Sequence, residues 1–72
     1  MKFTLKIKRL LLECGDLSEA ELARRLNIKP PTLHKKMKVD NFHIKDLQEI
    51  ADALGVELEA DVHFKLPDGT KI

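Results

Sequence analysis

Basic side chains are concentrated in one stretch of this chain. Between Ala23 and Val39 there are six Lys or Arg residues and no Asp or Glu. Lys and Arg donate hydrogen bonds to phosphate oxygens, and both reach the paired acceptor atoms O6 and N7 of guanine. The chemistry available to this stretch is therefore the non-covalent binding of a polyanion, although a run of charge alone is also typical of a solvated helix face.

The residues that other kinds of chemistry need are missing. Cys14 is the single cysteine, which excludes an internal disulfide and a CxxC metal site. The histidines His34, His43 and His63 lie nine and twenty residues apart and form neither HxxxH nor HExxH. There is no Gly-rich phosphate loop and no Ser-centred elbow. We therefore expect no cofactor, no bound metal, no small-molecule substrate and no enzymatic activity.

Charge is distributed unevenly along the chain. Up to Lys38 there are ten basic and four acidic residues, a net charge of +6, whereas from Val39 onward there are three basic and eight acidic residues, a net charge of −5. Such asymmetry turns the basic half of a molecule toward phosphates. The 72 residues allow one domain, residues 1–72. Neither a membrane-spanning stretch nor a signal peptide is visible, so a cytoplasmic location is the default expectation.

The basic stretch begins on a short helix with a defined start and end. Ser18 is a suitable N-cap, and Glu21 three residues later completes a capping box in which each side chain satisfies the other's backbone N–H. Leu17 and Leu22 form a hydrophobic staple around this start. Asn27 tolerates a left-handed backbone and is expected to end the helix.

A second helix follows after a tight turn. Pro30 precedes another proline and should be extended, as an N-cap is, while Pro31 fits the first helical position. Leu33 and Met37 lie four residues apart and should point inward. The opposite face carries no acid, and it consists of Pro31, Lys35 and Lys38, with Thr32 and His34 beside them and Lys36 at the boundary.

This pair of helices resembles the helix-turn-helix of the phage-repressor-like (xenobiotic-response-element) family of bacterial DNA-binding domains. The resemblance covers roughly Leu10 to Val56 and includes the segment KKMKVDNFHIKDLQEIADALGVEL. It implies a compact, mainly α domain of four to five helices that binds operators as a homodimer, with the second helix of the pair in the major groove. It places base-reading positions at Pro30, Pro31 and Lys35. Backbone contacts would fall on Ser18, Glu19, Thr32 and the loop from Lys38 to Asn41.

Other basic residues near the pair would contribute affinity. Arg25, Lys29, Lys36 and Lys38 would mostly neutralise phosphates, which sets binding strength rather than sequence choice. His34 flanks the basic face and can donate to a phosphate or a base; simple solvent exposure is an equally good interpretation of this residue.

Two further helices flank the pair. Residues 3–14 have apolar side chains at helical spacing, although alternation leaves a strand open for the first six or so of these residues. The other helix is expected to be capped at His43 and to end at Gly55. Its apolar stripe is Ile44, Leu47, Ile50, Ala51 and Leu54. Residues 1–55 would thus form the helical core.

From Val56 the apolar period changes from 3.6 to 2. Apolar residues alternate with polar ones without a miss up to Leu66, which predicts a long strand, and Pro67-Asp68-Gly69 then turns the chain back into residues 70–72. The long strand of this hairpin, residues 56–72, would leave most of an edge unpaired. We expect a second copy to cover it, with contacts through Leu58, Val62 and Phe64. The alternative is that the hairpin folds back over the helices of its own chain.

Two functions from different classes fit these observations. The first is a sequence-specific regulator of transcription, more often a repressor in the family resembled, which binds double-stranded DNA as a homodimer by inserting the helix from Pro31 to about Lys38 into the major groove. The second is a protein-interaction module, such as the antitoxin half of a paired system, which uses the apolar hairpin to hold another protein. Glu19 and the two prolines favour the second function, because they remove hydrogen-bond donors that a DNA reader uses.

Overall fold

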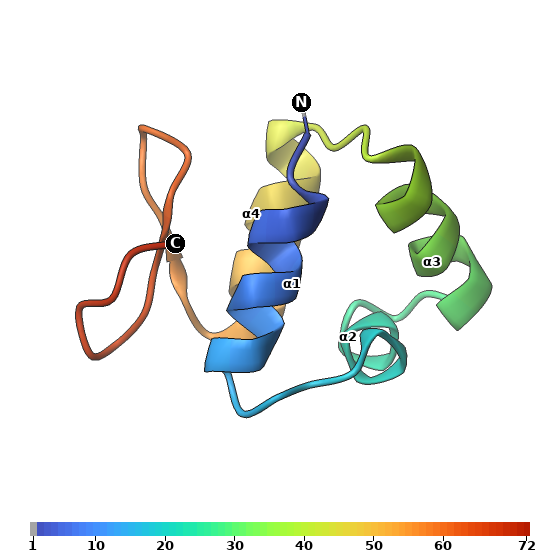
Figure 1. Ribbon diagram of the computed structural model, residues 1–72, viewed down its shortest axis with the longest axis horizontal. Coiled ribbons are helices and arrows are strands. Elements are labelled where there is room, and N and C mark those ends of the chain that lie inside the picture. The colour runs from blue at the N-terminus through green and yellow to red at the C-terminus, as the bar shows by residue number, and fades with distance from the viewer. Residues whose placement is uncertain (1) are drawn as a thin grey trace.

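The computed structural model describes residues 2–72, which form four helices followed by two short strands (Figure 1). The helices are α1 (Thr4–Glu13), α2 (Glu19–Arg25), α3 (Pro30–Val39) and α4 (Ile44–Leu54), and the strands are β1 (Glu57–Leu58) and β2 (Phe64–Lys65). In the view of Figure 1, α1 and α4 occupy the middle, α3 lies on one side and the C-terminal strands lie on the other. The prediction of a mainly helical domain with a C-terminal hairpin is confirmed.

A single cluster of buried apolar side chains joins all of these elements. Its members are Ile7, Leu10, Leu11, Leu22, Ala23, Leu33, Met37, Phe42, Leu47, Ile50, Ala51, Phe64, Leu66 and Ile72. Ala23 is completely buried where α2 meets α3, which agrees with the need for a small side chain at a close helix crossing. Because Phe64, Leu66 and Ile72 belong to this cluster, the C-terminal segment is an integral part of the domain core.

The first segment is a helix and not a strand. Its start is capped from a distant part of the chain, because the Oδ1 atom of Asp40 accepts hydrogen bonds from the backbone N–H of Phe3 (2.6 Å) and of Thr4 (2.8 Å). The hydroxyl of Thr4 donates in turn to the carbonyl of Met37 at 2.6 Å. Burial alone would raise the pKa of Asp40, but these hydrogen bonds and the charge of Lys2 together hold it below its ordinary value. The beginning of α1 is therefore fastened to the end of α3.

Helix α4 follows the predicted boundaries. The backbone N–H of its N-cap, His43, donates to Asp46 Oδ2 at 2.9 Å. At the other end Gly55 has φ 68°, and Val56 N–H donates to the carbonyl of Ala51 at 3.0 Å, as expected for a left-handed stop. The inclusion of Ile44 in the apolar stripe was wrong. This residue is 49% exposed because it occupies the first helical position, ahead of the turn that packs on the core.

The prediction of one long strand from Val56 to Leu66 was also wrong. The chain reverses within it, so that Glu57 pairs with Lys65 and Leu58 with Phe64 in an antiparallel register. Two backbone hydrogen bonds close the reversal, from Glu59 N–H to the His63 carbonyl (2.8 Å) and from Val62 N–H to the Glu59 carbonyl (2.9 Å). A strand gains hydrogen bonds only from a partner, and folding back supplies that partner within the same chain.

The second reversal, at Pro67-Asp68-Gly69, is present as predicted. Gly69 has φ 93°, and Leu66 N–H donates to the Thr70 carbonyl at 2.9 Å. Lys65 forms an antiparallel bridge with Lys71, so β2 is paired on both sides by its own chain. The long unpaired edge on which the dimer contact was based is therefore not formed, and within residues 2–72 the outer edge of β1 is only two residues long.

The three residues expected at a dimer contact have other surroundings. Phe64 is completely buried in the core of its own chain, and Leu58 and Val62 are half-buried against that core. Phe64 is thus not accessible to a second copy. The alternative interpretation, in which the hairpin folds over the helices of its own chain, agrees with this arrangement.

Candidate nucleic-acid interface

The joint between α2 and α3 has the bend that the sequence predicted. Ser18 Oγ accepts a hydrogen bond from Glu21 N–H at 3.1 Å at the start of α2. Asn27 has φ 59°, and the next residue, Ile28, donates its N–H to the carbonyl of Ala23 at 3.0 Å. The left-handed residue therefore ends α2 and turns the chain, and the half-buried Ile28 fixes the turn against the core.

The start of α3 differs by one residue from the prediction. Lys29 is the N-cap, with φ −75° and ψ 140°, and Pro30 and Pro31 are the first two helical residues. Pro30 adopts helical backbone although it precedes a proline. The first turn of a helix needs no backbone N–H, and the fixed φ of proline suits it, so both prolines fit there.

The outer face of α3 carries exposed side chains directly opposite its buried pair. Leu33 and Met37 are 1% and 4% exposed. At 100° per residue, Lys35 lies opposite the midpoint of these two side chains, and it is exposed. The other exposed residues on or beside this face are Pro31, Thr32, His34, Lys38, Val39 and, after the helix, Asn41, whereas Pro30, also exposed, lies at the start of the helix on the side of the buried pair. The predicted accessible face of α3 is therefore present.

Lys36, however, is half-buried and paired with a residue of another helix. Its Nζ atom lies 2.8 Å from Asp46 Oδ1, on α4. The hydrogen bond from Lys36 is the main cause that lowers the pKa of Asp46, with burial opposing it and the His43 N–H adding to it. The assignment of Lys36 to DNA phosphates stays a prediction, and within the chain its charge is balanced by Asp46 and the pair joins α3 to α4.

The two arginines of α2 are also paired internally. The Glu21 carboxylate accepts hydrogen bonds from Arg24, with Nε at 2.8 Å, and from Arg25 at 3.4 Å. These contacts, led by the hydrogen bond from Arg24, lower the pKa of Glu21 to about 2. Glu21 does not return a bond to the Ser18 N–H, so only half of the predicted capping box forms. Arg25 is exposed but shares its charge with Glu21.

Three lysines around α3 are left without an internal partner. None of the salt bridges formed within residues 2–72 involves Lys29, Lys35 or Lys38. All three side chains are exposed. An unpaired, solvated lysine keeps its full charge for an approaching anion.

A fourth basic residue, which the sequence analysis missed, reaches the same surface from α1. Lys8 lines an open hollow of about 330 Å³ together with Thr4, Glu19, His34, Met37 and Lys38. His34 is exposed, with Nδ1 3.9 Å from Glu19 Oε2. The sequence shows that Lys8 follows Thr4 by one helical turn, so the two residues share a face of α1. The contact of Thr4 with α3 could not be predicted from the sequence.

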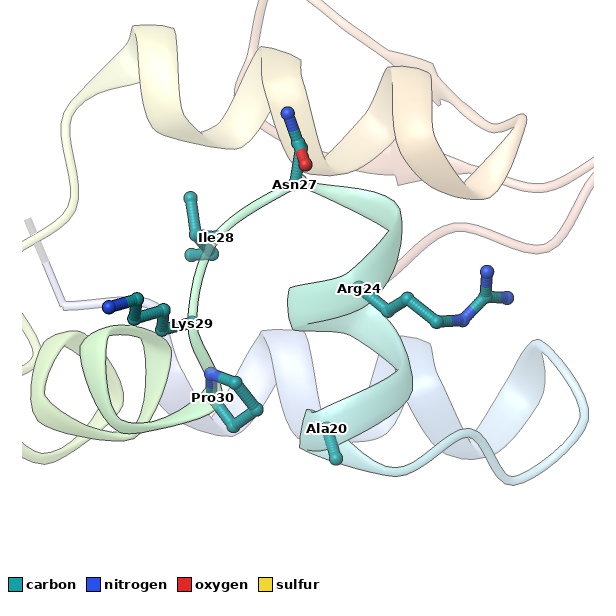
Figure 2. A pocket seen from close by; sticks show the side chains of 6 residues that line it. All are labelled: Ala20, Arg24, Asn27, Ile28, Lys29 and Pro30. Atoms are coloured by element: carbon teal, nitrogen blue, oxygen red, sulfur yellow. The ribbon is translucent and has the colours of Figure 1, made fainter.

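The turn itself is hollowed on its outer side. Figure 2 shows Pro30, at the start of α3, facing the side of α2 that carries Ala20, with Arg24 extending away from the turn. The hollow is open, has a volume of about 610 Å³, and is lined by Ala20, Arg24, Asn27, Ile28, Lys29 and Pro30. Ser18, another predicted backbone contact, is exposed at the N-terminal end of α2.

Other kinds of site are not evident in the described part of the chain. Across residues 2–72, no three His, Cys, Asp or Glu side chains gather closely enough to hold a metal ion. None of the helices in that range has the length and apolar character needed to cross a membrane.

Comparison with known protein families identifies the type of domain. The family model described as winged helix-turn-helix DNA-binding matches residues 2–39, which span α1, α2 and α3. No curated protein and no solved structure matches the chain. The matched family is of the helix-turn-helix type that the sequence analysis expected, but it is not the phage-repressor-like family specifically. Helix α4 and both strands lie outside the matched residues.

Proposed function

This chain belongs to the winged helix-turn-helix DNA-binding family, and we propose that it is a sequence-specific regulator of transcription that inserts α3 into the major groove of double-stranded DNA. The observation that carries the proposal is the outer face of α3, where Lys35 and Lys38 are exposed, unpaired and opposite the buried Leu33 and Met37. The major groove of B-DNA is wide enough to admit such a helix.

The proposal divides the lysines into two roles. Lys35 lies at the outermost position of α3, so we assign it to the base edges, with guanine as its partner. Lys29, Lys38 and Lys8 surround that position and are assigned to phosphates, which fix orientation rather than sequence. Exposed Ser18, Thr32 and Asn41 are further donors for the backbone, and the hollow at the α2–α3 turn, beside Lys29, offers room for a sugar–phosphate strand.

The unpaired lysines also set an expected dependence on salt. Neutralising three phosphates per copy, one for each of Lys29, Lys38 and Lys8, predicts that log Kobs falls against log salt concentration with a slope of about −2.7. If Arg24, Arg25 and Lys36 also bound phosphates, the slope would be steeper by about −0.9 for each. Their internal partners, Glu21 and Asp46, are the reason for excluding them.

The experiment that tests this function is selection of bound duplexes from a random library, followed by titration of the selected duplex and a scrambled duplex at several salt concentrations. We expect enrichment of a defined motif and salt-sensitive binding to both duplexes. No binding to either duplex at low salt would refute the proposal, since even non-specific affinity arises from unpaired basic groups.

Homodimeric binding, repression and a particular likeness to the phage-repressor-like family are finer proposals. A dimer would present two α3 helices about 34 Å apart, one turn of DNA, so a selected motif with two inverted halves at that spacing supports it. The hairpin no longer supports a dimer, because β2 is paired within its own chain. Sedimentation of the protein alone and with a selected duplex measures the stoichiometry.

The alternative function, a protein-interaction module, keeps the support of Glu19 and the two prolines but loses the hairpin as its binding surface. It required an apolar hairpin free to hold another protein, and Phe64, Leu66 and Ile72 of this hairpin are buried in the domain core. Glu19 still removes a donor from α2, and its nearest basic neighbour is His34. The non-enzymatic nature and cytoplasmic location of the chain remain expectations.

A further inference from the structure

One apolar residue at the end of α3 does not pack on the core of the domain. Val39 is 61% exposed and is not among the residues that pack on the core. It lines an open hollow of about 420 Å³ on the outer side of α3, together with Thr32, Lys35, Lys36 and Asn41. The residue that we assign to base contact and this apolar side chain therefore border the same space.

The helical spacing places Val39 in a symmetric arrangement. Pro31, Lys35 and Val39 are successive residues four apart, and each step advances the direction around the helix by about 40°. Lys35 is directly opposite the buried pair, so Pro31 and Val39 lie about 40° to either side of it. On the outermost side of α3, Lys35 therefore lies between two exposed apolar side chains, those of Pro31 and Val39.

We propose that Pro31 and Val39 read the methyl groups of thymines on either side of the guanine contacted by Lys35. This inference rests on the proposed function. The C5-methyl of thymine is the apolar group that a base pair presents in the major groove, and neither a proline nor a valine side chain can hydrogen-bond a base. Four residues of helix rise about 6 Å, which corresponds to roughly two base steps of 3.4 Å. The preferred site therefore has thymines about two steps from the guanine in both directions.

The test replaces thymine by deoxyuridine, one position at a time, in the selected duplex. Deoxyuridine keeps the base pairing and removes only the methyl group. We expect two positions at which the replacement weakens binding, each by about fourfold, the value of one buried methyl group. The variant Val39→Ala should bind the unmodified duplex about as weakly as the parent binds a duplex with one such replacement. Deoxyuridine at one of the two positions should no longer weaken binding of this variant, whereas deoxyuridine at the other position should still do so.

A matched control is available on another helix. Leu12 on α1 is also 61% exposed, so Leu12→Ala removes a similar amount of apolar surface from a helix other than α3. This variant should bind as the parent does and retain both deoxyuridine effects. Thermal unfolding of both variants, measured by circular dichroism, checks that each remains folded.

The possible outcomes separate the inference from the function. If the parent binds a selected duplex and Lys35→Ala weakens that binding, but no deoxyuridine replacement changes it, methyl reading is refuted and the proposed function stands. If Val39→Ala keeps both deoxyuridine effects, the assignment to Val39 is refuted. If the parent binds no duplex at low salt, both the function and the inference fail.

Discussion

Lys35 and Lys36 are adjacent in the sequence, but the structure gives them opposite roles, and this contrast can be tested quantitatively. Lys36 is paired with Asp46, whose side chain is only 17% exposed and also accepts the His43 N–H at the start of α4. Removing the charge of either partner should therefore lower the free energy of unfolding. Lys35 has no such partner, and its replacement should leave stability unchanged.

The expected magnitudes follow from these two contacts. Asp46→Ala removes a helix cap, worth about 1 kcal/mol, and a partly exposed ion pair, worth about 0.5 kcal/mol. For a domain of this size a total of about 1.5 kcal/mol lowers Tm by roughly 6–12 °C. Asp46→Asn keeps an acceptor for the cap and should cost only the ion pair, about 0.5 kcal/mol. In the background of Lys36→Met, Asp46→Asn should cost almost nothing, since the pair is already absent.

The same contact predicts a dependence on pH. The hydrogen bond from Lys36, opposed by burial and assisted by the His43 N–H, lowers the pKa of Asp46 in the folded state. The stabilisation is therefore fully present above the ordinary aspartate pKa of about 3.9, and it is lost as the pH falls through the lower folded value. The difference in unfolding free energy between parent and Asp46→Asn should be constant near neutral pH and should shrink at acid pH.

Urea unfolding and DNA titration of Lys35→Met and Lys36→Met complete the test. We expect Lys35→Met to keep the parent stability and lose DNA affinity, and Lys36→Met to lose stability and keep the salt slope of DNA binding. The reasoning would be refuted if Lys36→Met left stability unchanged and reduced the salt slope as Lys38→Met does.

Further predictions concern the groove contacts, the hairpin and the cap of α1. Lys35→Ala should cost about 1–3 kcal/mol on a selected duplex and relax its specificity, whereas Lys38→Ala should weaken all duplexes alike and reduce the salt slope by about one unit; titrations of selected and scrambled duplexes distinguish the two. Phe64→Ala should destabilise the domain by about 3–5 kcal/mol, as for a buried phenylalanine, and urea unfolding measures this; a stable, folded Phe64→Ala monomer would contradict its place in the core. Asp40→Asn should lower Tm at neutral pH, and the difference from the parent should fall as the pH drops through the lowered pKa of Asp40, because hydrogen bonds from Thr4 and Phe3 outweigh the opposing effect of burial.

The helices could be predicted from the sequence because their signals act within one turn. Ser18, Asn27 and Gly55 each determine the backbone at their own position, and the structure has a cap or a left-handed residue at all three. The four-residue spacing of Leu33 and Met37 likewise gave the outer face of α3 directly. Local rules of this kind do not depend on what the rest of the chain does.

The length of the strands could not be predicted in the same way, because a strand is defined by its partner. The alternation from Val56 to Leu66 is equally compatible with one long strand and with two short ones. The reversal, residues 59–63, contains no Gly, Pro or Asn and has Asp61 as its one turn-favouring residue. Its positive φ of 64° falls on Val62, a residue type that rarely adopts such a backbone.

Two contacts of the candidate interface were hidden for a related reason. Lys36 is balanced by Asp46 ten residues later, and Asp40 caps a helix that begins thirty-six residues earlier. Nothing in the local pattern distinguishes either residue from a solvated charge. Which lysines are available to DNA was therefore a property of the folded chain and could not be read from the charge run.

The hydrogen bonds of Asp40 link the end of α3 to the start of α1. Asp40 lies one residue beyond the segment that the family model matches. Residues 2–39 include everything that would touch DNA on α2 and α3, yet the side chain that secures the first helix is the very next one. A fragment cut at the family boundary would retain its lysines, but it would lose the Asp40 cap and the half of the buried core that the residues after 39 supply. Transfer of these helices to another protein should therefore include Asp40 and the residues that follow it.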